Sequence, residues 1–432
     1  MFRLFFFSFL LVSAQATYAQ STDNIPYSRI GLGDIFRHNN YQSIGMGGLG
    51  ASLHHPLYLN FANPASYSSL SFTNFEFGGR SNISVLQSDT VQVRSGDASI
   101  SYFVAGLPVT KKGGMAFGFV PYSHVGYNII QNYSDTLVGD YNIRKEGKGN
   151  VNQLFIGGAY DVIKGLTIGA NIYYTIGNID YNAFAEFGDT NLIANTEKLS
   201  KTNVRGTQIK IGALYEHIFS KIDEQKRALT IGATYTSSSK YTILTDNDWI
   251  RFNYNVLGGV DYSNANRPDT IYSDKEIKGN ISMPQSFSLG LSYNKLDNYT
   301  IGINAEHTQW KKYRKNGSAD LFSNETVIAA GLEYIPDIKS IKGYTKKIAY
   351  RFGVNYSTGK WQLNDLNNTK ISEAGISYGM GFPLKKMATR INTAFELGFR
   401  GNNDAQLIRE TYFRIHFGIS MNDNWFIKPK ID

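Results

Sequence analysis

Apolar and polar residues alternate with a period of two through most of the chain from about residue 73 onwards. In segment 408–420, for example, Phe413, Ile415 and Phe417 are separated by small or polar residues. Successive side chains of a β-strand point to opposite faces of the sheet. The pattern therefore predicts strands with one apolar face and one polar face. The alternation is equally regular in 165–177, 299–308 and 389–400.

Fourteen segments show this pattern, and most reach the length of about 9–11 residues that crosses a bilayer at a tilt. The segments are 73–84, 97–108, 113–131, 150–161, 164–181, 203–219, 227–243, 284–295, 298–311, 325–336, 346–358, 370–382, 388–401 and 408–420. The even-numbered connections are short (109–112, 162–163, 220–226, 296–297, 337–345 and 383–387), and the odd-numbered ones, such as 244–283, are mostly longer. Short turns at one side and long loops at the other are typical of outer-membrane barrels, and an even strand number puts both termini at the short-turn, periplasmic side.

The predicted fold class is therefore all-β: a transmembrane antiparallel β-barrel of about 14 strands, formed by residues 73–432. A β-sandwich would show the same alternation. However, charges and glycines occupy the second face along the whole chain, as a polar lumen requires. A closed barrel also satisfies every backbone group in hydrocarbon, which an open sheet does not.

The first 19 residues read MFRLFFFSFLLVSAQATYA. A short basic start, a brief apolar core and small residues at cleavage spacing predict a signal peptide, 1–19, that is removed on export. The alternative is an N-terminal anchor, but the apolar core is too short to span a bilayer. We therefore expect a protein of the bacterial outer membrane in contact with its lipids, and no nucleic-acid partner despite the net charge of +8.

The composition removes several kinds of chemistry. The chain has no Cys, which excludes a disulfide scaffold, a thiolate metal site and a Cys nucleophile. The adjacent His54 and His55 point apart, and no metal site or cofactor is predicted. A lipase-type barrel would need a Ser–His pair on the wall, and His416 has no recognisable Ser partner, so no enzyme is predicted.

Residues 20–72 break the alternation. They are dense in glycine and contain enough aromatic and aliphatic residues to disfavour disorder. A barrel of fourteen strands has a bore too wide to be filled by its own wall side chains. We therefore predict that this segment is a hatch inside the lumen. Charged residues on the polar face, such as Arg351, Arg400 and Arg414, either form a translocation path or pair with each other and with hatch residues such as Asp34; we favour the pairing.

The run QSIGMGGLGASLHHPLYLNFANPASYSSL, residues 42–70, resembles the hatch of FadL-type outer-membrane transporters. The ends YSRIGLGD and FRIHFGISMNDNWFIK resemble a subgroup found in Bacteroidota. One departure is His54-His55-Pro56, where the family usually has small and acidic residues. The residues that match the family's hatch motif are Met46, Gly47, Gly48, Gly50, Asn60, Asn63, Pro64 and Ala65.

The resemblance implies uptake of hydrophobic, fatty-acid-like molecules, which enter from outside and leave sideways into the membrane where the third strand is kinked. In this chain Pro121 cannot complete a central ladder, and Gly126 is a second weak point. Pro121, Tyr122 and Gly126 are therefore the candidate lateral opening. The alternative is a proline at the strand end, where pairing has already ceased.

Two other functions remain open at this point. Some barrels of the Bacteroidota subgroup are non-transporting subunits of outer-membrane assembly or secretion complexes. A general porin is a weaker alternative, because the predicted hatch would block it. Aromatic residues near segment ends are interpreted as two interfacial girdles. These residues are Tyr122, Tyr127, Tyr241, Trp249, Trp310, Tyr313, Trp361, Trp425 and Phe426.

Overall fold

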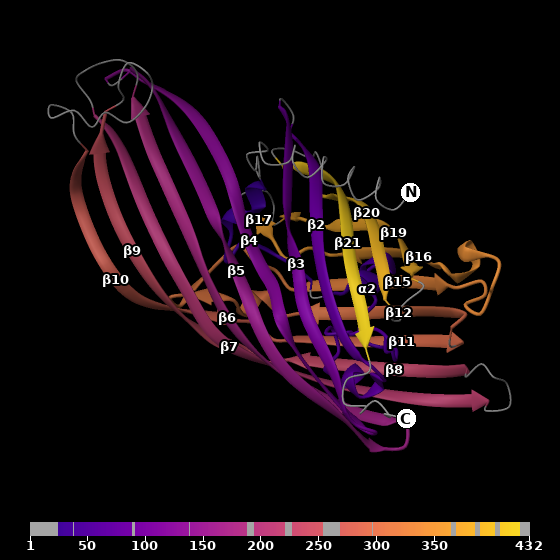
Figure 1. Cartoon of the computed structure of the whole chain (residues 1–432). Helices are drawn as coiled ribbons and strands as arrows, with labels where there is room; N and C mark the ends of the chain where they lie inside the picture. The colour runs from indigo at the N-terminus through magenta and orange to yellow at the C-terminus, as the bar shows by residue number, and fades with distance from the viewer. Residues whose placement is uncertain are drawn as a thin grey trace, which may run out of the picture.

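One antiparallel sheet closes on itself to form the wall of the molecule (Figure 1). Closure is made by β2 (Thr73–Gln87), which pairs along its whole length with β21 (Arg409–Asp423). The predicted signal peptide, 1–19, lies outside the described residues, as do Trp425 and Phe426. The computed structural model describes residues 25–37, 39–88, 91–137, 139–187, 194–220, 227–253, 268–295, 297–363, 369–384, 389–401 and 407–423.

The wall has fourteen strands, which confirms the predicted fold class. Two of them consist of two elements each: β8 (Arg227–Thr236) continues into β9 (Ser239–Phe252), and β10 (Asp269–Met283) continues into β11 (Ser286–Lys295). The other wall strands are β3 (Gln92–Thr110), β4 (Gly113–Asp135), β5 (Gly139–Ile163), β6 (Leu166–Phe187), β7 (Asn195–Ser220), β12 (Tyr299–Thr308), β15 (Glu325–Tyr334), β16 (Ala349–Ser357), β19 (Glu373–Pro383) and β20 (Arg390–Arg400).

Short elements lie inside the barrel or in its connections. Those before the wall are η2 (Pro26–Arg29), β1 (Asp34–Ile35), α2 (Tyr41–Gly45) and η3 (Pro64–Ser69). Those in the connections are η4 (Trp310–Lys312), β13 (Arg314–Lys315), β14 (Ser318–Ala319), η5 (Tyr344–Lys347), β17 (Gln362–Leu363) and β18 (Thr369–Lys370). Within the described residues, no helix has the length and apolar character needed to cross a membrane.

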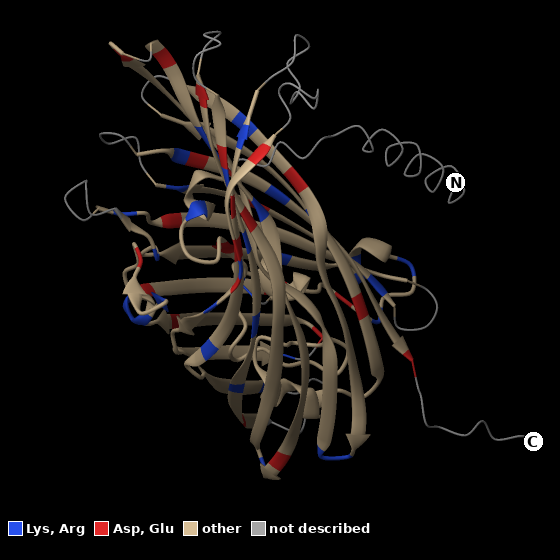
Figure 2. Ribbon diagram, turned by 90° about the vertical axis from the view of Figure 1, so that its left-hand side faces the viewer, with Lys and Arg blue, Asp and Glu red and all other residues tan. Residues whose placement is uncertain are grey.

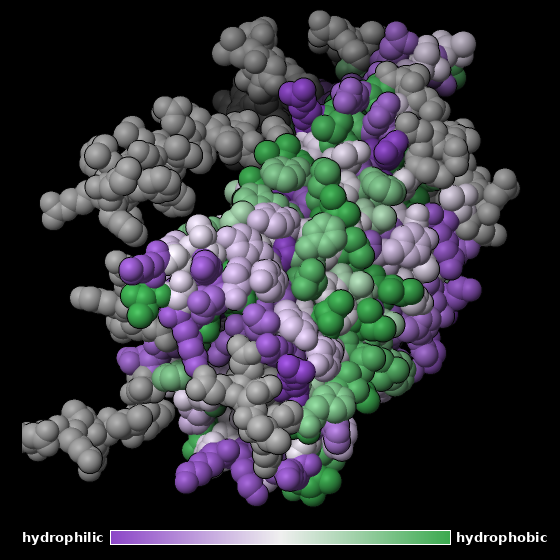
Figure 3. Space-filling model, turned by 90° about the vertical axis from the view of Figure 1, so that its right-hand side faces the viewer, coloured by the Kyte–Doolittle hydropathy of each residue, from purple (hydrophilic) through white to green (hydrophobic). Residues whose placement is uncertain are grey.

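Large apolar side chains cover the outside of the wall. Phe117, Ile156 and Ile172 lie next to each other on β4, β5 and β6 and are 44%, 54% and 55% exposed. Figure 3 shows such residues as a continuous green band bordered by hydrophilic side chains. An apolar outer band around a closed barrel is what a lipid-facing wall requires.

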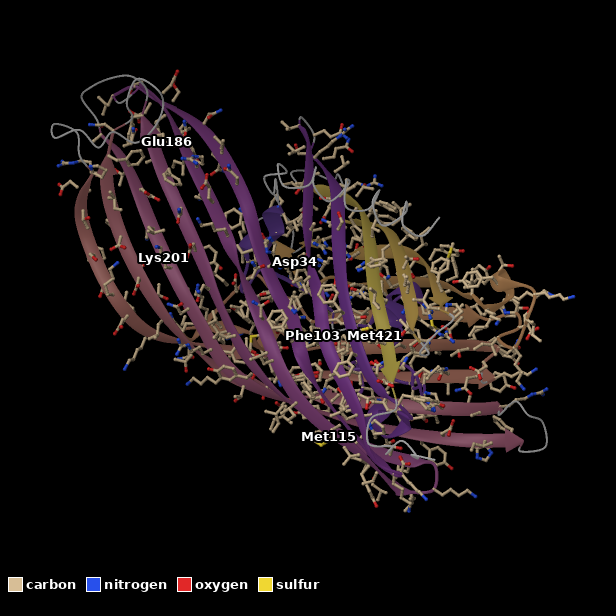
Figure 4. All side chains as sticks on the ribbon, viewed as in Figure 1. Asp34, Phe103, Met115, Glu186, Lys201 and Met421 are labelled. Carbon is tan, nitrogen blue, oxygen red and sulfur yellow. The ribbon has the colours of Figure 1, made fainter. Side chains whose placement is uncertain are left out.

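Strands β4 to β7, β9 and β10 continue well beyond this band and diverge from the rest of the wall (Figure 1). We call this region the upper sheet. It consists of 127–135 of β4, 139–148 of β5, 180–187 of β6, 195–203 of β7, 244–252 of β9 and 269–278 of β10. Charged residues are frequent along it (Figure 2), and Figure 4 places Glu186 and Lys201 there, away from Asp34.

The upper sheet corrects the predicted loop 244–283, because β9 and β10 occupy most of it and only 254–267 lie outside the described residues. The prediction was wrong for a physical reason. Residues 269–278 are exposed throughout, so neither face has to be apolar and the alternation disappears.

The predicted interfacial position is also wrong for Tyr122, Tyr241, Trp310, Tyr313 and Trp361. Their side chains are at most 8% exposed and form one core cluster in the upper part of the lumen. Tyrosines at the opposite, short-turn rim do face outwards. Among them, Tyr299 pairs with Tyr334, and Tyr334 pairs with Tyr350 across adjacent strands.

Candidate functional site

Residues 40–72, which we call the lower hatch, fill the short-turn half of the lumen. Twelve wall glycines receive them, since a Cβ on any of these glycines would come within 3.1 Å of a lower-hatch atom. On Gly353, for instance, it would lie 2.0 Å from the backbone nitrogen of Gly47. We call this set the glycine girdle. Its members are Gly78, Gly106, Gly114, Gly169, Gly212, Gly232, Gly290, Gly302, Gly331, Gly353, Gly379 and Gly418.

The Met-Gly-Gly part of the motif makes the closest approach to the wall. Met46 is fully buried, and its carbonyl oxygen would lie 2.3 Å from a Cβ on Gly331. Gly47 and Gly48 have φ values of +74° and +90°, which side chains other than glycine rarely adopt. The Gly47 N–H donates to the Ser377 hydroxyl of β19 at 2.9 Å. These residues therefore turn the chain while it touches the wall.

The asparagines of the motif hold the lower hatch together from within. Asn60 donates to the carbonyl oxygens of Gly50 and Leu53, both at 2.7 Å. Asn63 donates to the Ala51 carbonyl oxygen and accepts from the Ala65 N–H at 3.0 Å, which caps η3. Pro64 follows at the first position of η3, where its missing N–H has no cost. The motif thus has a structural role in the hatch.

Polar pairs join the lower hatch to the wall. Gln42 donates to Glu333, which accepts from the buried Arg351 at 2.7 Å. His54 lies 3.2 Å from Glu216 on β7. These contacts agree with our interpretation of the lumen charges as paired groups.

The wall has a break between β3 and β4 above the lower hatch. The ladder between these strands ends at the pair Phe103 and Phe119, although β3 stays paired with β2 and β4 with β5. Among the described residues, the part of β4 beyond Phe119 has no pairing with β3. The register of β4 against β5 also shifts between Pro121 and Ser123, as expected for a bulge at a residue without an N–H.

Residues 25–37, which we call the upper hatch, occupy the exposed edge of β4. In β1, Asp34 pairs with His124 and Ile35 with Ser123, in antiparallel orientation. The Ser123 hydroxyl donates to the Leu32 carbonyl oxygen at 2.7 Å. The edge of β4 that β3 leaves is thus completed by the chain's own N-terminal segment.

The three residues of the candidate opening lie in this region but have different surroundings. Pro121 lines a cavity, and Tyr122 is buried in the upper core cluster. Gly126 accepts a backbone bond from Ile25 at 2.7 Å and also contacts the Ser28 hydroxyl. Pro121 is thus the residue of the three that lines the cavity beside the wall break, while Tyr122 borders a second cavity of about 130 Å³ deeper in the lumen.

The cavity has a volume of about 190 Å³ and extends from the wall break into the lumen. At the break it is lined by Ile100, Val120 and Pro121, and Ile35 and Phe36 contribute from the upper hatch. Its inner part is charged. The charged lining residues are Asp34, Arg37, Arg80, Asp97, Glu325, Lys360, Glu373, Glu396, Arg400 and Arg414.

An ion cluster ties the upper hatch to the far wall across this cavity. Asp34 is 3.2 Å from Arg400 and 3.5 Å from Lys360. Arg400 also lies 3.3 Å from Glu373 and 3.2 Å from Glu410. Burial by itself would raise the pKa of Asp34, but the positive field of Arg400 and Lys360 outweighs it and lowers the pKa to about 2. Asp34 is therefore ionised at neutral pH.

A second titratable group lies in the lower hatch. Burial, which disfavours the charged imidazole, lowers the pKa of His55 to about 3 despite the opposing effect of Glu333. The neutral ring accepts the Leu57 N–H at 3.1 Å through Nδ1. Protonation would remove this acceptor. Among the described residues, no group of three or more His, Cys, Asp or Glu is placed to hold a metal ion.

Sequence reasoning missed two features of this site. Gly33, with a φ of +95°, allows β1 to approach β4, since a Cβ there would lie 2.3 Å from the His124 carbonyl oxygen. The glycine girdle was also missed. The sequence does contain a signal for this girdle. A glycine recurs on the inner face of most wall segments, where a larger side chain would prevent the hatch from packing against the wall.

The chain belongs to the BamG family, whose family model matches residues 1–432. No curated protein sequence matches the chain.

Solved structures with a similar fold are FadL-type barrels. A Pseudomonas aeruginosa FadL homologue superposes with a TM-score of 0.59 at 12% identity, over 90% of this chain and 99% of that one. The Ralstonia pickettii toluene transporter TbuX gives 0.57 at 14%, over 89% and 98%. The Pseudomonas putida toluene transporter TodX gives 0.56 at 14%, over 90% and 99%. At such low identity these likenesses concern the fold alone.

Proposed function

We propose that this barrel takes up a fatty-acid-like molecule from outside the cell and releases it sideways into the outer membrane between β3 and β4. The main support is the position of the cavity, whose lining reaches Ile100, Val120 and Pro121 at the point where the β3–β4 ladder ends. A ligand that leaves through the wall needs a break in the ladder beside a lumen cavity. Where neighbouring strands are hydrogen-bonded to each other, no gap between them is wide enough for a ligand to pass.

The lining chemistry favours an amphiphile over a pure hydrocarbon. Apolar side chains stand at the break, whereas the rest of the lining carries charges of both signs, among them the cations Arg37 and Arg414. An acyl chain suits the first region, and a carboxylate suits the second, because guanidinium groups bind carboxylates well. The structural neighbours TbuX and TodX are described as toluene transporters, and they support a hydrophobic substrate in a barrel of this shape.

Release requires movement of the upper hatch. Ile35 and its neighbours cover the β4 edge beside the break, so the ligand passes only when β1 moves away from β4. The lower hatch keeps its place against the glycine girdle and continues to block the passage to the periplasm. Transport in this scheme opens the wall without opening a pore.

A disulfide between β1 and β4 tests the proposal. The variant I35C/S123C joins paired residues at a spacing that suits a disulfide, and the chain has no other Cys. L291C/I303C is the matched control, because it staples two paired strands on the opposite part of the wall. The assay is uptake of radiolabelled oleate by cells that depend on this barrel. We expect oxidised I35C/S123C to lose uptake and to regain it on reduction, while the control transports in both states. Normal uptake by the oxidised variant would contradict the proposal.

A second candidate is a non-transporting subunit of an outer-membrane assembly or secretion complex. The observation that favours it is the upper sheet, which extends beyond the barrel and is exposed along the whole of 269–278. The resemblance of the chain ends to Bacteroidota barrels supports the same function. Mild solubilisation of native membranes separates the two candidates. A stoichiometric partner that is crosslinked from Tyr133 or Tyr272, combined with no oleate uptake in either redox state, would favour the subunit.

A further inference from the structure

The connection between β15 and β16, residues 335–348, lies on the outer side of the wall at the short-turn rim. The side chain of Arg351 is buried in the lumen, so its neighbours Tyr350 and Phe352 point outwards, and Phe352 is 50% exposed. The Tyr350 hydroxyl donates to the Thr345 carbonyl oxygen at 3.1 Å. Because Tyr350 faces outwards, this bond holds η5 against the lipid side of the barrel.

A second hydrogen bond fixes the same segment sideways. The Tyr344 hydroxyl donates to the carbonyl oxygen of Pro383 at the end of β19, at 3.2 Å. The connection is also closed on itself, since the Asp337 N–H donates to the Lys346 carbonyl oxygen at 2.8 Å. The predicted short turn 337–345 is therefore an ordered segment that is hydrogen-bonded to β16, to the end of β19 and to itself.

The neighbouring tyrosines mark the level of this segment in the bilayer. Tyr299, Tyr334 and Tyr350 follow one another on β12, β15 and β16, and all three lie at the short-turn ends of their strands. Tyrosine is typical of the boundary between lipid headgroups and hydrocarbon. Residues 335–348 thus lie at the headgroups of the periplasmic leaflet.

The composition of the segment fits that position. It contains Lys339, Lys342, Lys346 and Lys347 but only one acid, Asp337. No ion pair joins Lys342, Lys346 or Lys347 to a carboxylate within the described part of the chain. Lysines at a membrane surface are attracted to anionic lipid by about 1 kcal/mol each.

One apolar side chain stands out among these lysines. Ile341 is 96% exposed, and Tyr344 beside it is 48% exposed. Transfer of an isoleucine side chain from water to an apolar surrounding is favourable by about 1.5–3 kcal/mol. Beside outward-facing tyrosines and lysines, the acyl chains of the leaflet supply that surrounding.

We propose that residues 335–348 form a binding site for anionic phospholipid headgroups of the periplasmic leaflet, with the lysines on the phosphates and Ile341 among the acyl chains. This site is independent of uptake through the wall. It would fix the tilt and depth of the barrel on the side opposite the upper sheet.

Lipid retention tests the lysines. The full chain is released from nanodiscs of mixed phosphatidylglycerol and phosphatidylcholine and analysed by native mass spectrometry. We expect the wild type to retain phosphatidylglycerol in preference to phosphatidylcholine. In K342Q/K346Q/K347Q the ratio of the two retained lipids should fall by a factor of about five for each lysine replaced. The matched control is K201Q/K278Q in the upper sheet, which removes exposed lysines away from the lipid-facing band and should keep the preference. An equal preference in all three proteins would overturn the proposal.

A dye tests the isoleucine. In a chain without native Cys, I341C carries a single environment-sensitive fluorophore. We expect a blue-shifted emission that is quenched by lipids with a spin label near the headgroup, and a red shift when the three lysines are also replaced. Emission typical of water in phosphatidylglycerol nanodiscs would overturn the proposal and would leave the segment as a surface for a periplasmic protein. The heat-dependent mobility of the barrel on gels checks that each variant has folded.

Discussion

The lower and upper halves of the molecule hold their part of the hatch by different means. The lower hatch sits against the glycine girdle, where backbone touches backbone and a Cβ on Gly353 would already collide with Gly47. The upper hatch pairs with the edge of β4 through a two-residue strand, is joined to the far wall by the ion pairs of Asp34, and buries Tyr27, Ile30 and Leu32 in the upper core cluster. Both parts are packed, but the lower hatch meets wall glycines on most strands of the barrel, whereas part of the attachment of the upper hatch is a short ladder and an ion cluster, which can separate and reform.

This difference assigns separate tasks to the two halves. The lower half is a fixed plug within the lipid-facing wall. The upper half contains the break between β3 and β4, the cavity, and, among the described residues, the part of the hatch that pairs with β4 beside that break. Variants of the two halves should therefore have different consequences, and each prediction below is a way to test that division.

The largest effect is expected from the glycine girdle. Gly353→Leu places a side chain where the Met46–Gly47 backbone lies, and overpacking of this kind costs on the order of 3 kcal/mol. The lower hatch should leave its seat while the wall keeps its own hydrogen bonds, so conductance in planar bilayers should rise severalfold. The control Gly158→Leu, whose nearest neighbour is 3.6 Å away, should conduct like the wild type. Unchanged conductance of Gly353→Leu would show that the hatch does not close the lumen.

A comparable effect is expected where the lower wall faces lipid. Ile156→Arg should impair insertion by about 2–4 kcal/mol, since Ile156 lies among Phe117 and Ile172 in the apolar band. Ile130→Arg should cost little, although Ile130 is 57% exposed and Ile156 54%, because residue 130 belongs to the upper sheet. Folding titrations in lipid vesicles measure both. Equal costs would mean that the boundary between lipid and water is misplaced.

A smaller effect is expected at the ion cluster. Asp34→Asn removes the charge that Arg400 and Lys360 share, but Arg400 keeps Glu373 and Glu410, and Lys360 keeps its contact with the Trp361 ring. The loss should therefore be only about 1–2 kcal/mol. In a chain that carries I35C, the rate of labelling by a maleimide should rise about tenfold. Glu396→Gln, which changes another acid of the same cavity, should leave the rate unchanged. A similar rate increase in both variants would indicate a general loosening of the lumen.

The smallest effect concerns pH. His55 has a pKa of about 3 in the folded protein and about 6.5 when unfolded, so the unfolded state binds the extra proton first. The stability from the neutral ring is present above pH 6.5 and is lost as the pH falls towards 3, by about 1 kcal/mol at pH 5.5. Conductance events should become more frequent at pH 5.5 than at pH 7 in the wild type but not in His55→Gln. Asp34, with its pKa of about 2, stabilises the fold equally at pH 7 and pH 5.5 and therefore does not add to this change.

The sequence allowed accurate prediction where lipid imposes a rule. Strands that cross the bilayer need an apolar outer face, and β6, β11, β12 and β20 were recognised for that reason. The upper parts of β9 and β10 were predicted as a loop. A strand whose two faces are both exposed to water shows no alternation of apolar and polar residues. The hatch motif was located, yet its partners were not. The contact between Gly47 and Gly353 joins residues that are far apart in the chain, and no local pattern records it.

The ion pairs show the same limit. Asp34 and Arg400 could be named as charged residues of the hatch and lumen, but their distance of 3.2 Å follows from closure of the barrel. Pro121 was identified because its missing N–H is a local property. The occupation of the β4 edge by Asp34 and Ile35 depends on Gly33, whose positive φ is not evident from its neighbours.

Hydrogen exchange in lipid nanodiscs tests the division of the hatch most directly. The account predicts that backbone amides of residues 40–72 exchange at least tenfold more slowly than those of 25–37, and that oleate accelerates exchange only in 25–37 and in 119–126 of β4. Equal protection of the two hatch segments, or acceleration of 40–72 by oleate, would contradict it.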